Sequence, residues 1–279
     1  MSKRHDPPGP DAITEQLRRS LGILGLTHTL ATLDEHLAWA ARETPGAGAL
    51  LAHVLGDEAA HKLEQRIERR FTTSRLKERK ALEAFEWPFQ PGLDKALVLE
   101  LGRLDFVRRR DDLIITGKAG TGKSHILKAF VLRACQQQMR VRYARGVDLL
   151  DDLHAGLADG TYPSRLRGWA SADLLVIDDV GLGQVKKRED EPTAAHTLYD
   201  LIDRRHTKAS TAVSSNIPLS EWGKYLGDVR LAAAILDRLA MHAVHFDIDG
   251  PSYRQHLAQE RAGKQRRHPA AAPAPQSAT

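Results

Sequence analysis

The sequence is poor in cysteine, in long apolar runs and in net charge. Its 279 residues include one cysteine, Cys135, which excludes an internal disulfide and a zinc site built from several cysteines. The first ten residues, MSKRHDPPGP, are polar and break helices, unlike a secretory signal. No apolar run approaches the ~20 residues needed to cross a bilayer. We therefore expect a cytoplasmic protein with no membrane partner.

The net charge is weak evidence for a nucleic-acid partner, but basic residues are concentrated in one segment. The 41 basic residues are offset by 36 acidic ones, so distribution matters more than the total. Residues 62–80 carry eight basic side chains against three acidic ones. Such a helix can lie along a phosphate backbone, or it can be a solvated face with ion pairs one turn apart, and the pattern leaves both open. The candidate DNA contacts here are Arg66, Arg69, Arg70, Arg75 and Lys77.

The amino-terminal third has helical periodicity. Apolar residues recur at intervals of three and four, and we expect most of them to pack in a core. The segment 86–97 has two prolines and a glycine and is interpreted as a linker. We predict a disordered start at 1–10 and a small all-helical domain over 11–89 that contacts DNA, a partner or neighbouring subunits. The periodic residues include Ile13, Leu17, Leu21, Leu26, Leu30, Leu33, Leu37, Leu51, Leu55, Leu63, Ile67 and Phe71.

Beyond the linker, strand and helix patterns alternate. Predicted strands lie at 113–116, 141–144, 173–177, 210–215 and 243–248, with helices at about 123–138, 147–156, 193–206 and 231–240. Alternation of this kind predicts an α/β fold with a mostly parallel five-stranded sheet flanked by helices. We expect this domain to span 90–260 and the Pro/Ala-rich residues 261–279 to form a disordered tail.

The stretch GKAGTGKS follows the first predicted strand and opens a helix. In that context, G-x-x-x-x-G-K-[S/T] predicts a phosphate-binding P-loop rather than a plain glycine-rich turn. The glycines let backbone N–H groups converge on phosphate oxygens, the lysine reaches the β and γ phosphates, and the serine hydroxyl binds Mg²⁺. The predicted nucleotide-binding residues are Gly117, Lys118, Ala119, Gly120, Thr121, Gly122, Lys123 and Ser124.

Acidic residues at the end of a buried strand should complete this site. In DLLVIDD, Asp178 is predicted to bind Mg²⁺ with Ser124, and Asp179 to polarise the attacking water. Asn216, at the end of another strand, could orient that water or could be an ordinary turn residue. It is the only asparagine in the chain, so the Asn-Lys-x-Asp loop of guanine-specific GTPases is absent. ATP is therefore the predicted nucleotide.

Several stretches of the sequence together resemble a known family. It is similar to the IstB-type transposition helper ATPases of bacterial insertion sequences, relatives of the DnaC helicase loaders within the AAA+ class. The block SNIPLSEW, LAAAILDRL and GPSYR is more specific to that family than the phosphate loop. The resemblance is carried by residues 90–106, 117–126, 173–182, 214–228, 231–239 and 250–254.

The resemblance implies further roles. Asn216 matches the sensor of the γ phosphate, Arg238 the arginine finger that reaches a neighbouring subunit, and Arg254 the second sensor of its own subunit. Without the resemblance, both arginines would be interpreted as surface ion-pair partners. Asp179 departs from the family pattern, which more often has glutamate, and this predicts slow hydrolysis. A basic run, Lys186, Lys187 and Arg188, faces either DNA or solvent.

The resemblance also implies a function. We expect an ATPase that assembles as a head-to-tail homo-oligomer on duplex DNA, presents target DNA to an IstA-type transposase and disassembles on hydrolysis. A DnaC-like helicase loader would use the same nucleotide residues. A small-molecule kinase on the same loop is disfavoured, because no arginine-bearing lid is evident between the third and fourth strands.

Overall fold

The computed structural model describes residues 9–183 and 193–267, and these divide into two compact units between Arg69 and Arg70. The division falls earlier than the boundary expected near residue 89. The reason is that residues 70–89 pack with the second unit: Leu82 and Phe85 are buried there, and the Tyr143 backbone N–H donates to the Ser74 carbonyl at 2.8 Å. None of the helices in the described ranges combines the length and hydropathy that crossing a bilayer requires.

The first unit is built from helices α1 (Pro10–Ile23), α2 (Thr27–Ala31), α3 (Leu33–Glu43) and most of α4 (Ala47–Thr73). Polar contacts join these helices. The backbone and hydroxyl of Thr29 donate to Glu58 Oε2 at 2.7 and 2.9 Å, and the Trp39 and His53 rings stack with centroids 4.0 Å apart. The unit is therefore helical, as the periodicity predicts.

The expectation that most of its periodic apolar residues form a core is wrong. Of the periodic residues described in this unit, Leu33 is buried, whereas six are at least 37% exposed. The physical reason is size: so few helices enclose little interior volume, so a helical period identifies a face without showing what covers that face. The six exposed residues are Ile13, Leu17, Leu37, Leu51, Leu55 and Leu63.

The second unit contains a five-stranded parallel sheet. The strands are β1 (Asp112–Gly117), β2 (Val141–Arg145), β3 (Leu174–Val180), β4 (Ser210–Ser215) and β5 (Ala243–Ile248), in the order β2-β3-β4-β1-β5. Central strands β3 and β4 are buried along most of their length, and β1 is buried from Leu113 to Ile115, as continuous apolar runs predict for a sheet covered on both faces. The predicted fold and all five strands are confirmed.

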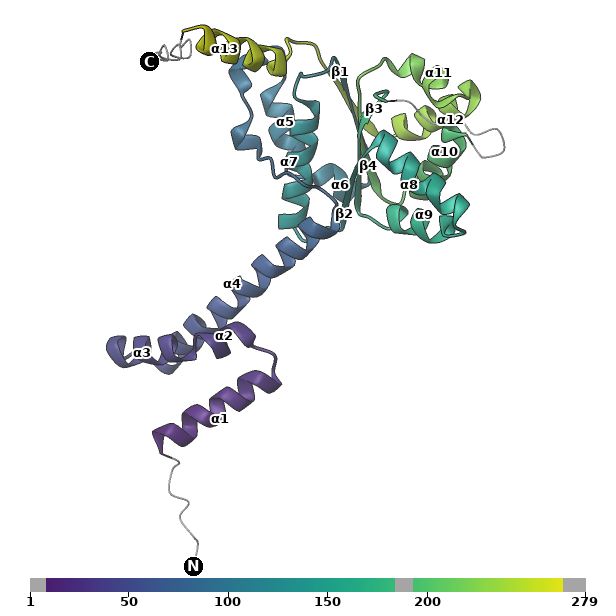
Figure 1. Cartoon of the computed structure of the whole chain (residues 1–279). Helices are drawn as coiled ribbons and strands as arrows, with labels where there is room; N and C mark the ends of the chain where they lie inside the picture. The colour runs from purple at the N-terminus through teal and green to yellow at the C-terminus, as the bar shows by residue number, and fades with distance from the viewer. Residues whose placement is uncertain (1–8, 184–192, 268–279) are drawn as a thin grey trace, which may run out of the picture. The chain divides into compact units, whose positions relative to one another are not determined.

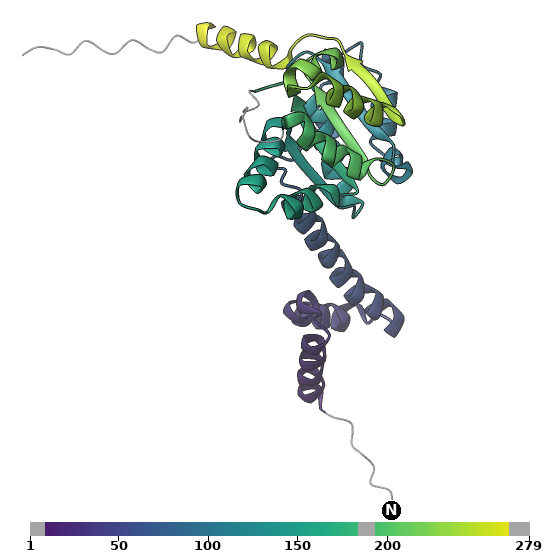
Figure 2. The same ribbon diagram turned by 90° about the vertical axis from the view of Figure 1, so that its right-hand side faces the viewer.

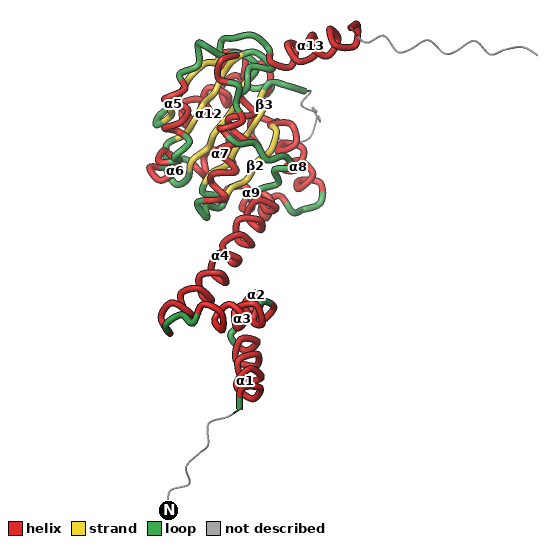
Figure 3. The backbone as a smooth tube through the Cα atoms, turned by 90° about the vertical axis from the view of Figure 1, so that its left-hand side faces the viewer, coloured by secondary structure: helices red, strands yellow, loops and turns green. Residues whose placement is uncertain are grey.

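Helices cover the sheet on two sides (Figure 1). Helices α5 (Lys95–Leu101), α6 (Asp105–Arg109) and α7 (Lys123–Gln136) lie on the side that faces the viewer in Figure 3. The opposite side, seen in Figure 2, carries five more helices. These are α8 (Gly146–Ala158), α9 (Tyr162–Ala170), α10 (Ala194–Arg205), α11 (Trp222–Leu226) and α12 (Val229–Ala240).

Some elements differ from the predicted ones. Helices α5, α6, α9 and α11 were not expected, because all four are short. Helix α13 (Tyr253–Arg267) continues past residue 261, where the sequence predicts a disordered tail. Three short 3-10 turns complete the unit, at Leu82–Ala84, Trp87–Phe89 and Leu219–Glu221.

Because the strands are parallel, their carboxyl ends gather at one edge of the sheet and their amino ends at the other. Arg145 of β2 pairs in register with Asp178 of β3, and Thr116 of β1 with Ser215 of β4. The polar residues predicted from separate strand ends are thus neighbours at the carboxyl edge.

A buried arginine, Arg205, stabilises the amino edge of the sheet. Arg205 is 1% exposed, and its guanidinium donates to the carbonyls of Ala170 and Ala172 at 2.9 and 2.7 Å, and also to the Ser210 carbonyl. Burial lowers the pKa of Arg205 to about 10, despite the charge of nearby Asp112. Burial likewise raises the pKa of Asp112 to about 6. Desolvation therefore outweighs the mutual attraction of these two charges.

Candidate nucleotide-binding site

The phosphate loop joins β1 to α7, as predicted from GKAGTGKS. Gly117, Gly120 and Gly122 all have positive φ, at 136°, 86° and 105°, a region that side chains disfavour. A Cβ at Gly122 would lie 2.6 Å from the Phe85 ring, and one at Gly117 would lie 2.4 Å from the Ile248 carbonyl oxygen. Backbone conformation and close packing both require glycine here.

Lys123 opens α7 and is 3% exposed. Its ammonium donates to the carbonyls of Gly117 and Lys118 at 2.7 and 2.8 Å. Burial lowers the pKa of Lys123, and the charges of Asp179 and Asp178 act in the opposite sense. A desolvated cation at a helix amino terminus is a favourable place for phosphate.

Asp178 lies beside Ser124, as the metal-site prediction requires. The Ser124 hydroxyl donates to Asp178 Oδ1 at 3.1 Å, and Asp178 is 1% exposed. The Ser214 hydroxyl also donates to Oδ1, and the Tyr143 hydroxyl donates to Oδ2 at 2.6 Å. Four groups thus fix this carboxylate, the fourth being the Asp179 backbone N–H at 3.1 Å.

Tyr143 and Ser214 were not predicted. Burial and the charge of Asp178 raise the pKa of Tyr143, so its hydroxyl stays a proton donor. Ser214 stands in the SSN run before Asn216, where its place on the strand could have identified it. Tyr143 has no local signal, because its contact depends on the pairing of β2 with β3.

The structure also brings Asp179 and Asn216 together. The Asn216 side-chain N–H donates to Asp179 Oδ1 at 2.8 Å. Asp179 has φ of 57°, which is uncommon for a residue with a side chain, and its N–H also donates to the Ser214 hydroxyl at 2.9 Å. Strain of this kind, held by surrounding contacts, concentrates at functional sites.

These groups open into one cleft of about 660 Å³. Arg254, predicted to act on the nucleotide of its own subunit, lines it. So do Phe89 and Tyr253, whose rings meet at 5.1 Å, and the Tyr253 backbone N–H donates to the Gly120 carbonyl at 3.0 Å. The segment that carries Arg254 is thereby tied to the phosphate loop.

Arg238 is placed differently. It is not among the described residues that line the cleft; instead its guanidinium binds Asp203 at 2.9 Å and the Tyr199 hydroxyl at 2.6 Å. This position suits an arginine that acts on another subunit, and equally the surface ion pair considered from the sequence.

The predicted DNA contacts are divided between the two units. Arg66 and Arg69 belong to the first unit, and Arg70, Arg75 and Lys77 to the second. Arg75 is engaged within the fold: it lies over the Trp169 ring at 4.6 Å and pairs with Asp152 at 3.6 Å. Lys186, Lys187 and Arg188 lie outside the described residues.

The donors present suit Mg²⁺. A serine hydroxyl and a carboxylate are hard oxygen ligands, and Mg²⁺ usually takes only one or two protein carboxylates, with water and phosphate completing its shell. In keeping with this, no group of three or more His, Cys, Asp or Glu in residues 9–183 and 193–267 could form an all-protein metal cage.

The chain is 31% identical over 239 residues to a Pseudomonas aeruginosa protein named for insertion sequence IS21 and ATP binding, covering 86% of this chain and 88% of that protein. A Geobacillus stearothermophilus protein, named for IS5376 and ATP binding, is 30% identical over 204 residues, covering 73% and 79%.

Among solved structures, DnaA from Aquifex aeolicus bound to AMPPCP has a TM-score of 0.51 at 20% identity, over 72% of this chain and 58% of that one. A DNA replication initiation factor has a TM-score of 0.52 at 21% identity, over 69% and 56%. At such identities the likeness shows the fold alone, a parallel α/β sheet flanked by helices. The model of the IstB-like ATP binding protein family matches residues 19–261, and the chain therefore belongs to that family of insertion-sequence ATP-binding proteins.

Proposed function

We propose that this protein is an ATP-dependent regulator of DNA transposition that assembles on target duplex DNA when it holds ATP. The observation that carries the proposal is the joint placement of Lys123, the Ser124–Asp178 pair and the Asp179–Asn216 pair in one cleft, on a chain of the IstB-like family. The names of its relatives associate them with insertion sequences.

Within the cleft, each group has a proposed task. Lys123 and the loop N–H groups bind the phosphates, and Ser124 and Asp178 hold Mg²⁺, which neutralises phosphate charge. Asp179 accepts a proton from the attacking water, and Asn216 orients both that carboxylate and the water. Arg254 contacts phosphate from the same subunit. Aspartate is one methylene shorter than glutamate, so slow hydrolysis, suited to a timed switch, is expected.

The proposed assembly of subunits depends on Arg238. We propose that it leaves Asp203 and reaches the nucleotide of the adjacent subunit, where a trans guanidinium accelerates phosphoryl transfer by about 10³-fold or more. Such an interface is head-to-tail, so it generates rings or open helices. Nucleotide between subunits then stabilises the assembly, and its hydrolysis dissolves it. Duplex DNA and an IstA-type transposase are the proposed partners.

The test is the size of the protein with and without its ligands. Gel filtration and electron microscopy with duplex DNA and a non-hydrolysable ATP analogue should show assemblies that form only when both are present. Lys123→Ala is the matched control and should stay small. A protein that remains a monomer under saturating ligands contradicts the proposal. A stable complex with a replicative helicase, without assembly on duplex, would instead favour the helicase loader.

A further inference from the structure

A second cleft, of about 570 Å³, lies at the amino edge of the sheet. It is formed by the residues that precede four strands: Arg110 before β1, Arg140 before β2, Asp173 before β3 and Ala209 before β4. It is thus opposite the nucleotide site across the length of the strands, ~20 Å at ~3.3 Å per residue. Its basic residues, which define the basic cleft, are Arg108, Arg110, Arg140, Arg204 and Lys208.

All five basic side chains are exposed, and they divide into two groups. Arg140 is neutralised by Asp173 at 2.6 Å, and Arg108 by Asp105 at 2.5 Å. The side chains of Arg110, Arg204 and Lys208 make no hydrogen bond or ion pair with any part of the chain that the structure describes. Three unpaired cations therefore face one opening, and among the described residues that line it the one acidic side chain, Asp173, is already paired.

Cations at this edge have one structural role, the stabilisation of helix ends. Helices α6, α7, α9 and α10 all end near this edge, and basic residues stabilise helix carboxyl ends. The buried Arg205 already performs this role, since it binds the carbonyls at the end of α9 and at the starts of β3 and β4. The exposed Arg204 lies in the last turn of α10, where its charge favours that helix end, but neither Arg204 nor Lys208 binds any of these carbonyls.

One residue of the basic segment found in the sequence influences the basic cleft electrostatically. Burial raises the pKa of Asp173, but hydrogen bonds from Arg140 and the charges of Arg140 and Arg70 outweigh burial, so the pKa is lowered overall. The charge of Arg70, near the end of α4, thus acts on the acidic residue of the cleft, although Arg70 itself does not line it.

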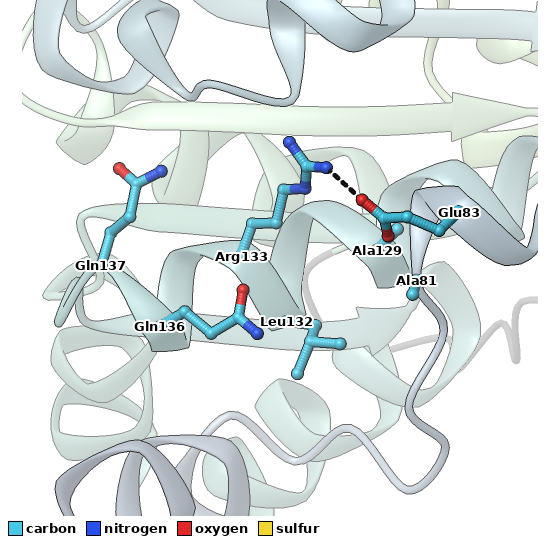
Figure 4. Close-up of a pocket in the computed structure, with 7 residues that line it drawn as sticks. All are labelled: Ala81, Glu83, Ala129, Leu132, Arg133, Gln136 and Gln137. Carbon is cyan, nitrogen blue, oxygen red and sulfur yellow. Dashed lines mark hydrogen bonds and ion pairs between the residues drawn. The ribbon is translucent and has the colours of Figure 1, made fainter. Parts of the chain in front are cut away.

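Another hollow on the second unit differs from the basic cleft in the charge of its lining. The hollow of about 420 Å³ beside α7 has one cation in its lining, Arg133, which is paired with Glu83 at 2.7 Å (Figure 4). The other polar side chains there, Gln136 and Gln137, are neutral. Unpaired positive charge is thus a property of the basic cleft and does not accompany every hollow of this fold.

We propose that the basic cleft binds the phosphate backbone of duplex DNA, through Arg110, Arg204 and Lys208. This inference rests on the proposed function and adds a DNA contact on the ATPase unit itself. Exposed, unpaired cations spread over several elements suit a polyanion, whose binding is driven by release of counterions. The lining offers valine, methionine and alanines, which give no deep apolar pocket for anchoring an acidic peptide.

The experiment compares two doubly substituted proteins of equal charge. One carries Arg204→Gln and Lys208→Gln; its control carries Lys224→Gln and Arg230→Gln, which are exposed residues outside the cleft. Binding to a short labelled duplex is measured by fluorescence anisotropy over a range of salt concentrations, with a non-hydrolysable ATP analogue present. Nucleotide affinity is measured separately and should be the same in both variants.

The expected result is a slope of log affinity against log salt that is smaller by about 2 per bound subunit in the cleft variant, since each lost phosphate contact removes about 0.9. The control should keep the wild-type slope. Equal slopes in the two variants overturn the inference while leaving the proposed function standing. A wild-type protein that binds no duplex defeats both. Loss of transposase binding with an unchanged DNA slope would show a protein-docking surface and also overturn the inference.

Discussion

Asp112 provides a direct test of the electrostatics of the sheet. Burial raises its pKa from the ordinary 3.8 to about 6, so the folded state holds this proton more tightly than the unfolded chain. The stabilisation of the fold by this tighter proton binding is complete below pH 3.8, and it is lost as pH rises through about 6. The difference of about 2 pH units corresponds to roughly 3 kcal/mol as an upper limit, at ~1.4 kcal/mol per unit.

Asp112→Asn removes this pH dependence and keeps the acceptor for the Thr211 backbone N–H, now 2.6 Å from Oδ1. Allowing for partial solvent access, we expect the variant to be more stable than wild type by about 1–3 kcal/mol at pH 8, and by about half as much at pH 5. Urea unfolding can be followed by the fluorescence of the buried residues Trp169 and Trp222.

The matched control is Asp111→Asn, one residue earlier. Asp111 forms an ion pair at 2.7 Å with Arg109, an exposed arginine. Loss of a surface pair should change stability by less than about 1 kcal/mol. An Asp112→Asn protein that is equally or less stable than wild type at pH 8 would refute the reasoning, because the attraction of Arg205 would then outweigh burial.

Three further predictions concern the nucleotide site. Lys123→Ala should weaken ATP binding about a hundredfold, because a charge-assisted contact is worth up to ~3 kcal/mol; normal affinity by fluorescent-nucleotide titration would contradict the loop assignment. Asp179→Ala should retain ATP-driven assembly but slow turnover by about 10² or more; unchanged phosphate release would exclude it as the base. Gly122→Ala should lower ATP affinity at least about tenfold, whereas Gly160→Ala, which also has positive φ but open space around its Cβ, should not. Equal effects would show that the contact with Phe85 is unimportant.

The sheet and the phosphate loop were predictable because their signals are local. Apolar runs, alternation with helices and a glycine pattern between strand and helix are all contained in short windows of sequence. Parallel pairing then places strand ends together, so the meeting of Ser124 with Asp178 follows from topology. The roles of Asp179, Asn216, Arg238 and Arg254 stay predictions.

Other features depend on contacts between distant segments. Arg205 stands in a charged run that resembles a solvated surface, yet it is buried because free carbonyls from three elements converge on it. Tyr143 reaches Asp178 only through the register of β2 with β3. Residues 70–85 lie before the predicted linker but pack with the second unit, where Phe85 fills the space beside Gly122. No local sequence pattern indicates these contacts.

The central claim, that one subunit completes the nucleotide site of the next, is tested most directly by mixing two inactive proteins. Arg238→Ala lacks the proposed finger and keeps its own base; Asp179→Ala lacks the base and keeps the finger. With duplex DNA and ATP, an equal mixture should recover about a quarter of the wild-type phosphate release, since random head-to-tail neighbours complete that share of the sites. A mixture that assembles on DNA but stays as inactive as its components would contradict the account.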